Sequence, residues 1–316
     1  MANTDVMSNK KWGVFNHYLY NIQNNPAYPN NMGAGETSWQ ECTAALDVKK
    51  IARQLHEVGA GYYFITSMQG RRYMIAENAR YREIIGDESA DECLSKRDLI
   101  EELYEALSEY GIDLYLYFTG DGPYKDEEEG KKFGFIEPRQ NVSMEFAEKW
   151  ASVLEWYSKH YGDKIKGYWI DGCYDHEWFG YTPDKLEPFY NAVKSGNPDA
   201  LVTMNNGVKR GLYRYFPKED FVSGEQENLD VVPESRYLDG AQTFILLPIG
   251  NGDMGIGCAW GSGGLSFTGE QLADYAEKVT SVGGVVTFDC MVARDGSFDE
   301  EQIAALKVVG DRLKTR

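Results

Sequence analysis

The sequence predicts an α/β protein whose architecture is a (β/α)8 barrel of the TIM type. Its 316 residues fit one barrel of this kind better than two ordinary domains. Short apolar runs alternate with helical patterns almost from end to end, which is typical of a parallel sheet covered by helices. Apolar residues make up 42% of the chain and aromatic residues 14%, enough for a large core. We therefore expect a single catalytic barrel domain over residues 1–316.

Eight short runs, mostly apolar, are the candidate strands of this barrel. Such runs indicate strands that are buried on both faces. In chain order they are Trp12–Tyr18, Gly61–Ser67, Asp113–Phe118, Gly167–Asp171, Leu201–Asn205, Asp220–Gly224, Thr243–Leu247 and Gly284–Asp289. Their number matches the eight parallel strands of the predicted fold.

The helices between these strands carry recognisable start and stop signals. Apolar residues recur every three or four positions over Asp47–Val58 and Leu99–Tyr110, and a glycine follows each run. Thr268-Gly269-Glu270-Gln271 matches the capping box that opens a helix. The last helix is expected to begin near Ser297 and to run to the end of the sequence.

The alternating pattern weakens between Gly207 and Gly264. No strong helix follows the fifth, sixth or seventh strand, so either the barrel is degenerate in its second half or long loops replace helices there. Seven glycines surround Trp260, and glycine-rich loops of this length often cover an active site.

Charge and cysteine usage exclude several classes of function. A net charge of −18 argues against nucleic acid or an anionic membrane as a partner, because phosphate groups require a basic surface. The five cysteines are widely spaced without a CxxC pair, and the four histidines show no paired ligand spacing, so we expect no metal and no cofactor. No signal segment or membrane-spanning run is visible. A reduced, cytoplasmic protein is expected.

The most informative stretch is Tyr168-Trp169-Ile170-Asp171-Gly172. An acid at the carboxyl end of a buried parallel strand points into the mouth of a barrel, where catalytic groups lie. Aromatic neighbours predict a pocket that suits a sugar ring; they are Tyr168, Trp169, Tyr174, Trp178 and Phe179. We interpret Asp171 as the nucleophile of a glycoside hydrolase.

Cleavage of a glycosidic bond requires a second carboxyl group near the first. Glu225 directly follows the sixth predicted strand, and Glu227 lies two residues further on. An acid held close to Asp171 in a dry site retains its proton, as a general acid must. Glu225 is the favoured candidate, and Glu227 and Asp239 stay open as alternatives.

Several segments together carry a family resemblance over nearly the whole chain. They are Trp12–His17, Glu36–Trp39, Asp47–Tyr63, Tyr168–Gly172, Asp220–Glu225, Ser281–Val286 and Asp295-Gly296. In order and spacing they resemble glycoside hydrolase family 29, the retaining α-L-fucosidases. The resemblance implies that Asp171 is the nucleophile, that Glu225 is the acid/base, and that His17 and Trp39 contact the sugar.

The chain departs from that family in its sugar-binding residues. Thr66-Ser67-Met68-Gln69-Gly70 stands where the family has a His-His pair, and Asn205-Asn206-Gly207 stands where an arginine is expected. Asp239 stands in place of a further glutamate, and we expect no C-terminal β-sandwich of the usual kind. The same chemistry on a related sugar, such as one of L-galactose configuration, is therefore an alternative to fucose.

The sequence thus predicts double displacement on a small oligosaccharide or glycoside. Asp171 attacks the anomeric carbon while Glu225 protonates the departing oxygen. The candidates for holding the sugar ring are His17, Trp39, Gln69, Tyr117, Trp169, Asn205 and Trp260. The alternatives are an α-L-glycosidase of other specificity, for example an α-L-galactosidase, and a catalytically inactive sugar-binding barrel.

Overall fold

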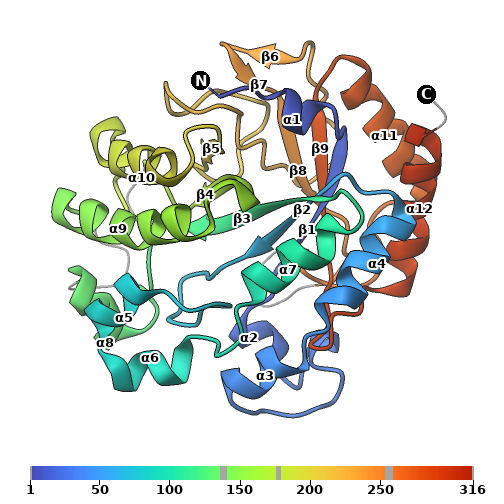
Figure 1. Cartoon of the computed structure of the whole chain (residues 1–316). Helices are drawn as coiled ribbons and strands as arrows, with labels where there is room; N and C mark the ends of the chain where they lie inside the picture. Colours follow the sequence, from blue (N-terminus) through green and yellow to red (C-terminus); the bar gives the residue numbers. More distant parts are fainter. Residues whose placement is uncertain (1, 136–140, 176–178, 253–258, 315–316) are drawn as a thin grey trace.

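Seven parallel strands form one curled sheet in the computed structural model, which describes residues 2–135, 141–175, 179–252 and 259–314 (Figure 1). The strands follow one another in the order β5-β4-β3-β2-β1-β9-β8. Their bounds are β1 Trp12–Asn16, β2 Tyr62–Thr66, β3 Asp113–Thr119, β4 Ile165–Asp171, β5 Leu201–Met204, β8 Phe244–Pro248 and β9 Val285–Cys290. A curled parallel sheet of this kind is compatible with the predicted TIM-like barrel.

Helices lie around the outside of the sheet (Figure 1). The long ones are α4 Val48–Val58, α7 Leu99–Ser108, α9 Met144–Tyr161, α10 Pro183–Gly196, α11 Gly269–Ser281 and α12 Glu300–Lys314. The short ones are α1 Asp5–Ser8, α2 Tyr20–Gln23, α3 Trp39–Ala45, α5 Ala79–Ile85, α6 Asp87–Cys93, α8 Glu127–Phe133, η1 Pro29–Asn31 and η2 Gly162–Lys164. The predicted capping box of α11 is confirmed, since Thr268 and Gln271 exchange both of its hydrogen bonds.

The strands bury both faces, and their side chains alternate between two core layers. Along β3, Tyr115 and Tyr117 face the inside of the curled sheet, whereas Leu116 packs outward against the helices. The inner layer is Met7, Phe15, Tyr62, Phe64, Tyr115, Tyr117, Trp169, Leu201, Phe221, Val222, Ala241, Phe244, Leu246, Trp260 and Val285. The same alternation places Trp169 inside and Tyr168 outside, so Tyr168 does not line the predicted aromatic pocket.

The predicted strand at Asp220–Gly224 is wrong as a regular strand. The segment forms only isolated parallel bridges, from Phe221 to Gln242 and from Glu225 to Leu246. Gly224 has a φ of +58°, and a Cβ there would lie 1.8 Å from the carbonyl oxygen of Phe244. The left-handed conformation at Gly224 therefore interrupts the extended backbone, and only glycine fits so close to the next strand.

On its other side this segment pairs with β5 mainly through carboxylate side chains. The backbone N–H of Val202 donates to Oδ2 of Asp220 at 3.1 Å, and that of Met204 donates to Oε2 of Glu219 at 3.3 Å. One backbone bond, from Asp220 to the carbonyl of Val202 at 2.9 Å, joins them. Residues 219–226 thus link both edges of the sheet without a continuous backbone ladder.

Few regular elements occupy the region between β5 and α11. Apart from β8, its described residues, 205–252 and 259–268, contain only the short hairpin β6 Tyr237–Leu238 and β7 Ala241–Gln242, and no helix. In the same described parts of the chain Cys42, Cys93, Cys173 and Cys290 are buried and unpaired, and Cys258 lies outside them. No helix among the described residues has both the length and the apolar character needed to cross a bilayer.

Candidate active site

Asp171 ends β4 beside β3, and two tyrosines hold its carboxylate. The hydroxyl of Tyr117 donates to Oδ2 at 2.6 Å, and the hydroxyl of Tyr174 donates to Oδ1 at 3.4 Å. Tyr117 is 1% exposed, so its hydroxyl makes this bond away from bulk water. A hydrogen bond to an ionised carboxylate is stronger than one between neutral groups, which fixes the orientation of Asp171.

Asn205, the residue after β5, joins Asp171 to Glu225. Its Nδ2 donates to Oδ1 of Asp171 at 2.8 Å and to Oε2 of Glu225 at 2.7 Å. Because these two distances meet at one nitrogen with two N–H donors, the two carboxyl oxygens are no more than about 5.5 Å apart. The structure therefore brings together the two acids that the sequence analysis paired.

Glu225 lies in surroundings that favour its protonated form. Burial, together with the negative charge of Asp171, raises the pKa of Glu225 to about 8. The hydrogen bond from Asn205 acts in the opposite direction but is outweighed. At neutral pH, Glu225 can therefore donate a proton.

Aromatic rings continue the site from Asp171 towards β1. Trp169 stacks on Tyr117 with 5.6 Å between ring centroids, and its Nε1 donates to the carbonyl of Ser223 at 2.9 Å. The ring of His17 lies 6.2 Å from that of Tyr117, and the ring of Trp260 lies 6.0 Å from that of His17. Five predicted ring-binding residues, namely His17, Tyr117, Trp169, Asn205 and Trp260, thus form one connected group with the two acids.

Trp39 and Gln69 are not part of this group. The indole of Trp39 is 2% exposed, donates to the carbonyl of Met74 at 2.7 Å and packs against Tyr18, Tyr20 and Tyr73. Gln69 is half-buried on the loop after β2, and its side chain has no hydrogen bond among the described residues. His176 and Trp178 lie outside the described residues.

The two alternative acids lie elsewhere. Glu227 is exposed and lines a groove of about 330 Å³ with Lys209 and Arg210. Asp239 is exposed at the turn of the β6–β7 hairpin, which precedes β8 and so lies towards the amino ends of the strands. The geometry favours Glu225, because Glu225 and Asp171 share Asn205.

A further acid of the site, Asp121, was not predicted from the sequence. It follows β3, is 8% exposed, and accepts a hydrogen bond from the hydroxyl of Thr119. Burial, with a smaller contribution from the charge of Asp171, raises its pKa to about 7. An acid flanked by glycines at a strand end, as in Gly120-Asp121-Gly122, was the signal that could have found it.

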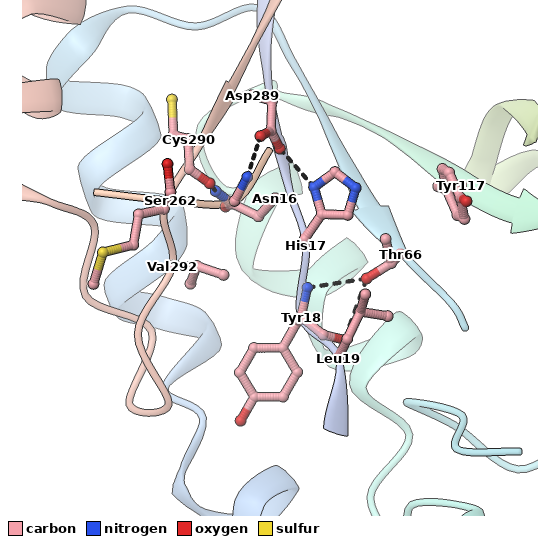
Figure 2. A network of polar contacts seen from close by, with 12 residues as sticks. Asn16, His17, Tyr18, Leu19, Thr66, Tyr117, Ser262, Asp289, Cys290 and Val292 are labelled. Atoms are coloured by element: carbon pink, nitrogen blue, oxygen red, sulfur yellow. Dashed lines mark hydrogen bonds and ion pairs between the residues drawn. The ribbon is translucent and has the colours of Figure 1, made fainter. Parts of the chain in front are cut away.

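Asp289 in β9 also went unassigned, although it ends the eighth predicted strand. Its Oδ1 accepts from Nδ1 of His17 at 2.8 Å (Figure 2). Its Oδ2 accepts from the backbone N–H of Gly261 at 2.5 Å. No cluster of three or more histidine, cysteine or acidic side chains that could hold a metal occurs among the described residues.

Comparisons with known proteins bear on the fold. No family profile and no curated protein sequence matches the chain. An endo-fucoidan hydrolase of glycoside hydrolase family 107 is 14% identical with a TM-score of 0.67, over 99% of this chain and 94% of its own. The α-L-fucosidase AlfC from Lactobacillus casei, solved with α-L-fucose product, is 18% identical with a TM-score of 0.64, over 99% and 100%. A family 29 α-L-fucosidase from Bacteroides thetaiotaomicron is 18% identical with a TM-score of 0.60, over 98% and 73%.

At these identities the likeness establishes a shared fold. The chain has the architecture of fucosidase-like glycoside hydrolases, and families 29 and 107 both occur among its structural neighbours. The resemblance to family 29 in the sequence is thus matched by fold, while a second family of hydrolases shares that fold as well.

Proposed function

We propose that the protein is a retaining glycoside hydrolase that releases a terminal α-L-fucose-type sugar. The observation that carries this proposal is the bridge from Asn205 to Asp171 and Glu225, which limits the separation of their oxygens to about 5.5 Å. Retaining glycosidases hold their two carboxyl groups about 5–5.5 Å apart, whereas inverting enzymes need room for a water between them. The sugar class is supported by the structural neighbours, which are named as α-L-fucosidases and endo-fucoidan hydrolases.

The first step of the reaction forms a covalent intermediate. Oδ2 or Oδ1 of Asp171 attacks the anomeric carbon while Glu225 transfers its proton to the glycosidic oxygen, and the bond between that carbon and oxygen breaks. Tyr117 donates to Asp171 at 2.6 Å and keeps the carboxylate oriented towards the sugar. Because its pKa is raised, Glu225 carries a proton at neutral pH and supplies it in this step.

The second step releases the sugar. Glu225, now ionised, takes a proton from a water molecule, and the resulting hydroxide displaces Asp171 from the anomeric carbon. The two successive inversions restore the original configuration. The neutral amide of Asn205 donates to Asp171 and Glu225 alike, so it keeps them in place as their charges change.

The sugar ring lies against the connected aromatic group. Tyr117, Trp169 and Trp260 form the aromatic side of the site, and His17 supplies a nitrogen for a hydroxyl group. Trp39 packs into the fold instead, so a role in recognition would require it to leave its bond to Met74.

A panel of aryl glycosides tests the proposal. The panel contains α-L-fucoside, α-L-galactoside, β-D-galactoside and β-D-glucoside, and proton NMR follows the anomeric configuration of the sugar first released. We expect hydrolysis of the α-L-fucoside with retention. Release of the inverted anomer, or calorimetric binding of fucose without hydrolysis over days, would contradict the proposal.

An α-L-galactosidase is the second candidate. The observation that favours it is the loop after β2, where Met68 is fully buried and Gln69 is half-buried in place of a histidine pair. L-galactose differs from L-fucose by a hydroxyl at C6, and the Gln69 amide would bind it only if the loop after β2 moved towards the aromatic group. A higher kcat/KM on the α-L-galactoside of the same panel would select this reading.

A further inference from the structure

Asp289 connects two parts of the site that come from distant segments. Its carboxylate is 1% exposed and bonds both His17, which follows β1, and Gly261, the residue after Trp260. One oxygen accepts from His17 and the other accepts from Gly261. Both oxygens of Asp289 therefore hold backbone or side chain next to the rings of Tyr117 and Trp260.

The chemistry of a carboxylate determines which nitrogen of His17 carries the proton. An ionised carboxylate accepts hydrogen bonds and donates none. Burial raises the pKa of Asp289, and the interactions with His17 and the N–H of Gly261 oppose that rise. When Asp289 is ionised, Nδ1 of His17 carries the proton at 2.8 Å from it, and Nε2 faces away (Figure 2). Among the described residues no group hydrogen-bonds Nε2, and the ring stands beside Tyr117.

The Gly261 backbone lies directly against His17. Gly261 has a φ of +65°, and a Cβ there would lie 3.1 Å from Cβ of His17. The turn that carries Trp260 can approach His17 this closely only with glycine at position 261. The bond from its N–H to Asp289 at 2.5 Å anchors the turn in that place.

We propose that Asp289 is a positioning residue that keeps the proton of His17 on Nδ1 and holds the Trp260 turn against the same ring. His17 and Trp260 then act as one unit, with Nε2 of His17 available to accept a hydroxyl group of the sugar. The part of this proposal that concerns the sugar rests on the proposed function, whereas the part that concerns His17 and Trp260 does not.

Asp289→Asn tests the proposal through the arrangement of donors and acceptors. An asparagine offers one acceptor oxygen and one NH2 group, so it cannot accept from both His17 and Gly261. We expect either the proton of His17 to move to Nε2 or the turn at Gly261 to shift. The measurements are the ¹⁵N signals of the imidazole nitrogens, assigned with His17→Gln, and the indole signal of Trp260, assigned with Trp260→Phe.

Steady-state kinetics on the best substrate of the panel provide a second test of the role of Asp289. We expect kcat/KM of Asp289→Asn to fall roughly tenfold to a hundredfold, as when the partner that orients a functional histidine is removed. The matched control is Asp113→Asn at the amino end of β3, where the carboxylate lies 3.7 Å from Nζ of Lys10. This control should leave the signals of His17 and Trp260 and the kinetics unchanged.

Two outcomes would overturn the proposal. One is a wild-type His17 protonated on Nε2 alone, and the other is an Asp289→Asn protein in which the His17 and Trp260 signals do not move. If that variant does not fold, Gly261→Ala takes its place and should shift both signals together; movement of Trp260 without His17 would contradict the coupling. If the wild type cleaves no glycoside of the panel, the proposed function fails, while the NMR result still decides the role of Asp289.

Discussion

Asp171 and Glu225 meet at Asn205 from two very different kinds of structure. Asp171 ends β4, which pairs in parallel with β3 on one side and β5 on the other. Glu225 ends a segment that touches β7 and β8 through one isolated bridge each, and β5 mainly through the side chains of Glu219 and Asp220. The first acid is positioned by backbone hydrogen bonds that many sequences could make, and the second depends on particular buried side chains.

The difference lies in what each region loses when a side chain changes. Backbone pairing of β4 survives most substitutions, because its donors and acceptors belong to the main chain. The side chain of Asp220 is fully buried, and it accepts from Lys194 at 2.7 Å, from Val202 at 3.1 Å and from Ala2 at 2.7 Å. Loss of that one carboxylate leaves the N–H groups of Ala2 and Val202 without this acceptor and leaves Lys194 with only the carbonyl of Ala200, so this region couples folding to individual residues.

Replacement of Asp171 should give the largest effect and should affect catalysis alone. We expect Asp171→Asn to retain less than roughly a thousandth of the wild-type kcat, a loss of about 4 kcal/mol in barrier lowering, because an amide is a poor nucleophile. The free energy of unfolding should change less than in the Asp220 variant, because the ladders of β4 do not use this side chain and asparagine keeps one acceptor oxygen for Tyr117, Tyr174 and Asn205. Steady-state kinetics and urea denaturation measure both quantities.

The control for this variant is Asp184→Asn in the exposed first turn of α10. It should leave kcat unchanged. An Asp171→Asn enzyme that keeps near-full turnover would remove the nucleophile from the proposal and with it the contrast between the two acids.

Replacement of Asp220 should give the next largest effect, and this effect should be on the stability of the fold. We expect Asp220→Ala to lower the free energy of unfolding by about 3–5 kcal/mol, because removing one partner of a buried ion pair leaves the other uncompensated. Urea denaturation followed by circular dichroism provides the measurement. Glu155→Ala, which breaks an exposed pair with Lys159 on α9, should cost only about 0.3–0.5 kcal/mol. Equal losses from the two variants would show that the segment does not depend on its buried side chains.

The pH dependence of the reaction should give the smallest of the three effects. Glu225 must be protonated to act as the acid, and burial beside Asp171 raises its pKa to about 8. The first step should therefore be fastest below that pH, and kcat/KM should fall about tenfold per pH unit above it. The measurement is kcat/KM from pH 6 to pH 10 on the aryl α-L-fucoside.

Glu225→Gln tests whether the fall of kcat/KM at alkaline pH, the alkaline limb of the profile, comes from Glu225 or from another titrating group. An aryl glycoside with a good leaving group needs little help from an acid, so the variant should retain measurable activity on it and should lose the alkaline limb. A limb that persists in Glu225→Gln would mean that another group, such as Asp121 with its pKa near 7, controls the rate.

Local pattern was sufficient for most of the fold. Seven of the eight predicted strands occur within a few residues of their expected bounds, because apolar runs between polar turns are a local property. The sixth failed for a reason that composition does not reveal. Phe221 and Val222 are as apolar as a strand requires, but Glu219 and Asp220 use their side chains to bond β5, and Gly224 adopts a left-handed conformation.

Some residues of the candidate site could likewise be predicted from the sequence, and others could not. Asp171 and Glu225 are visible in the sequence because each acid stands at the end of a predicted strand. Asp121 and Asp289 carry the same signal, but nothing in their neighbours shows that their carboxylates turn inward. Trp39 is of a suitable residue type for a sugar contact, yet its indole donates to the carbonyl of Met74 and lies outside the aromatic group around Asp171.

From the order of its residues alone, this chain specifies an alternating α/β fold, most of its strand positions, and the two acids at strand ends. These features depend on the period of apolar residues and on short-range turn and cap signals. The joining of Asp171, Asn205 and Glu225, the carboxylate pairing of residues 219–220, and the link from Asp289 to His17 and Trp260 arise only when the curled sheet brings distant segments together. Contacts between residues far apart in the chain depend on packing geometry, and no local pattern encodes which buried side chain meets which partner.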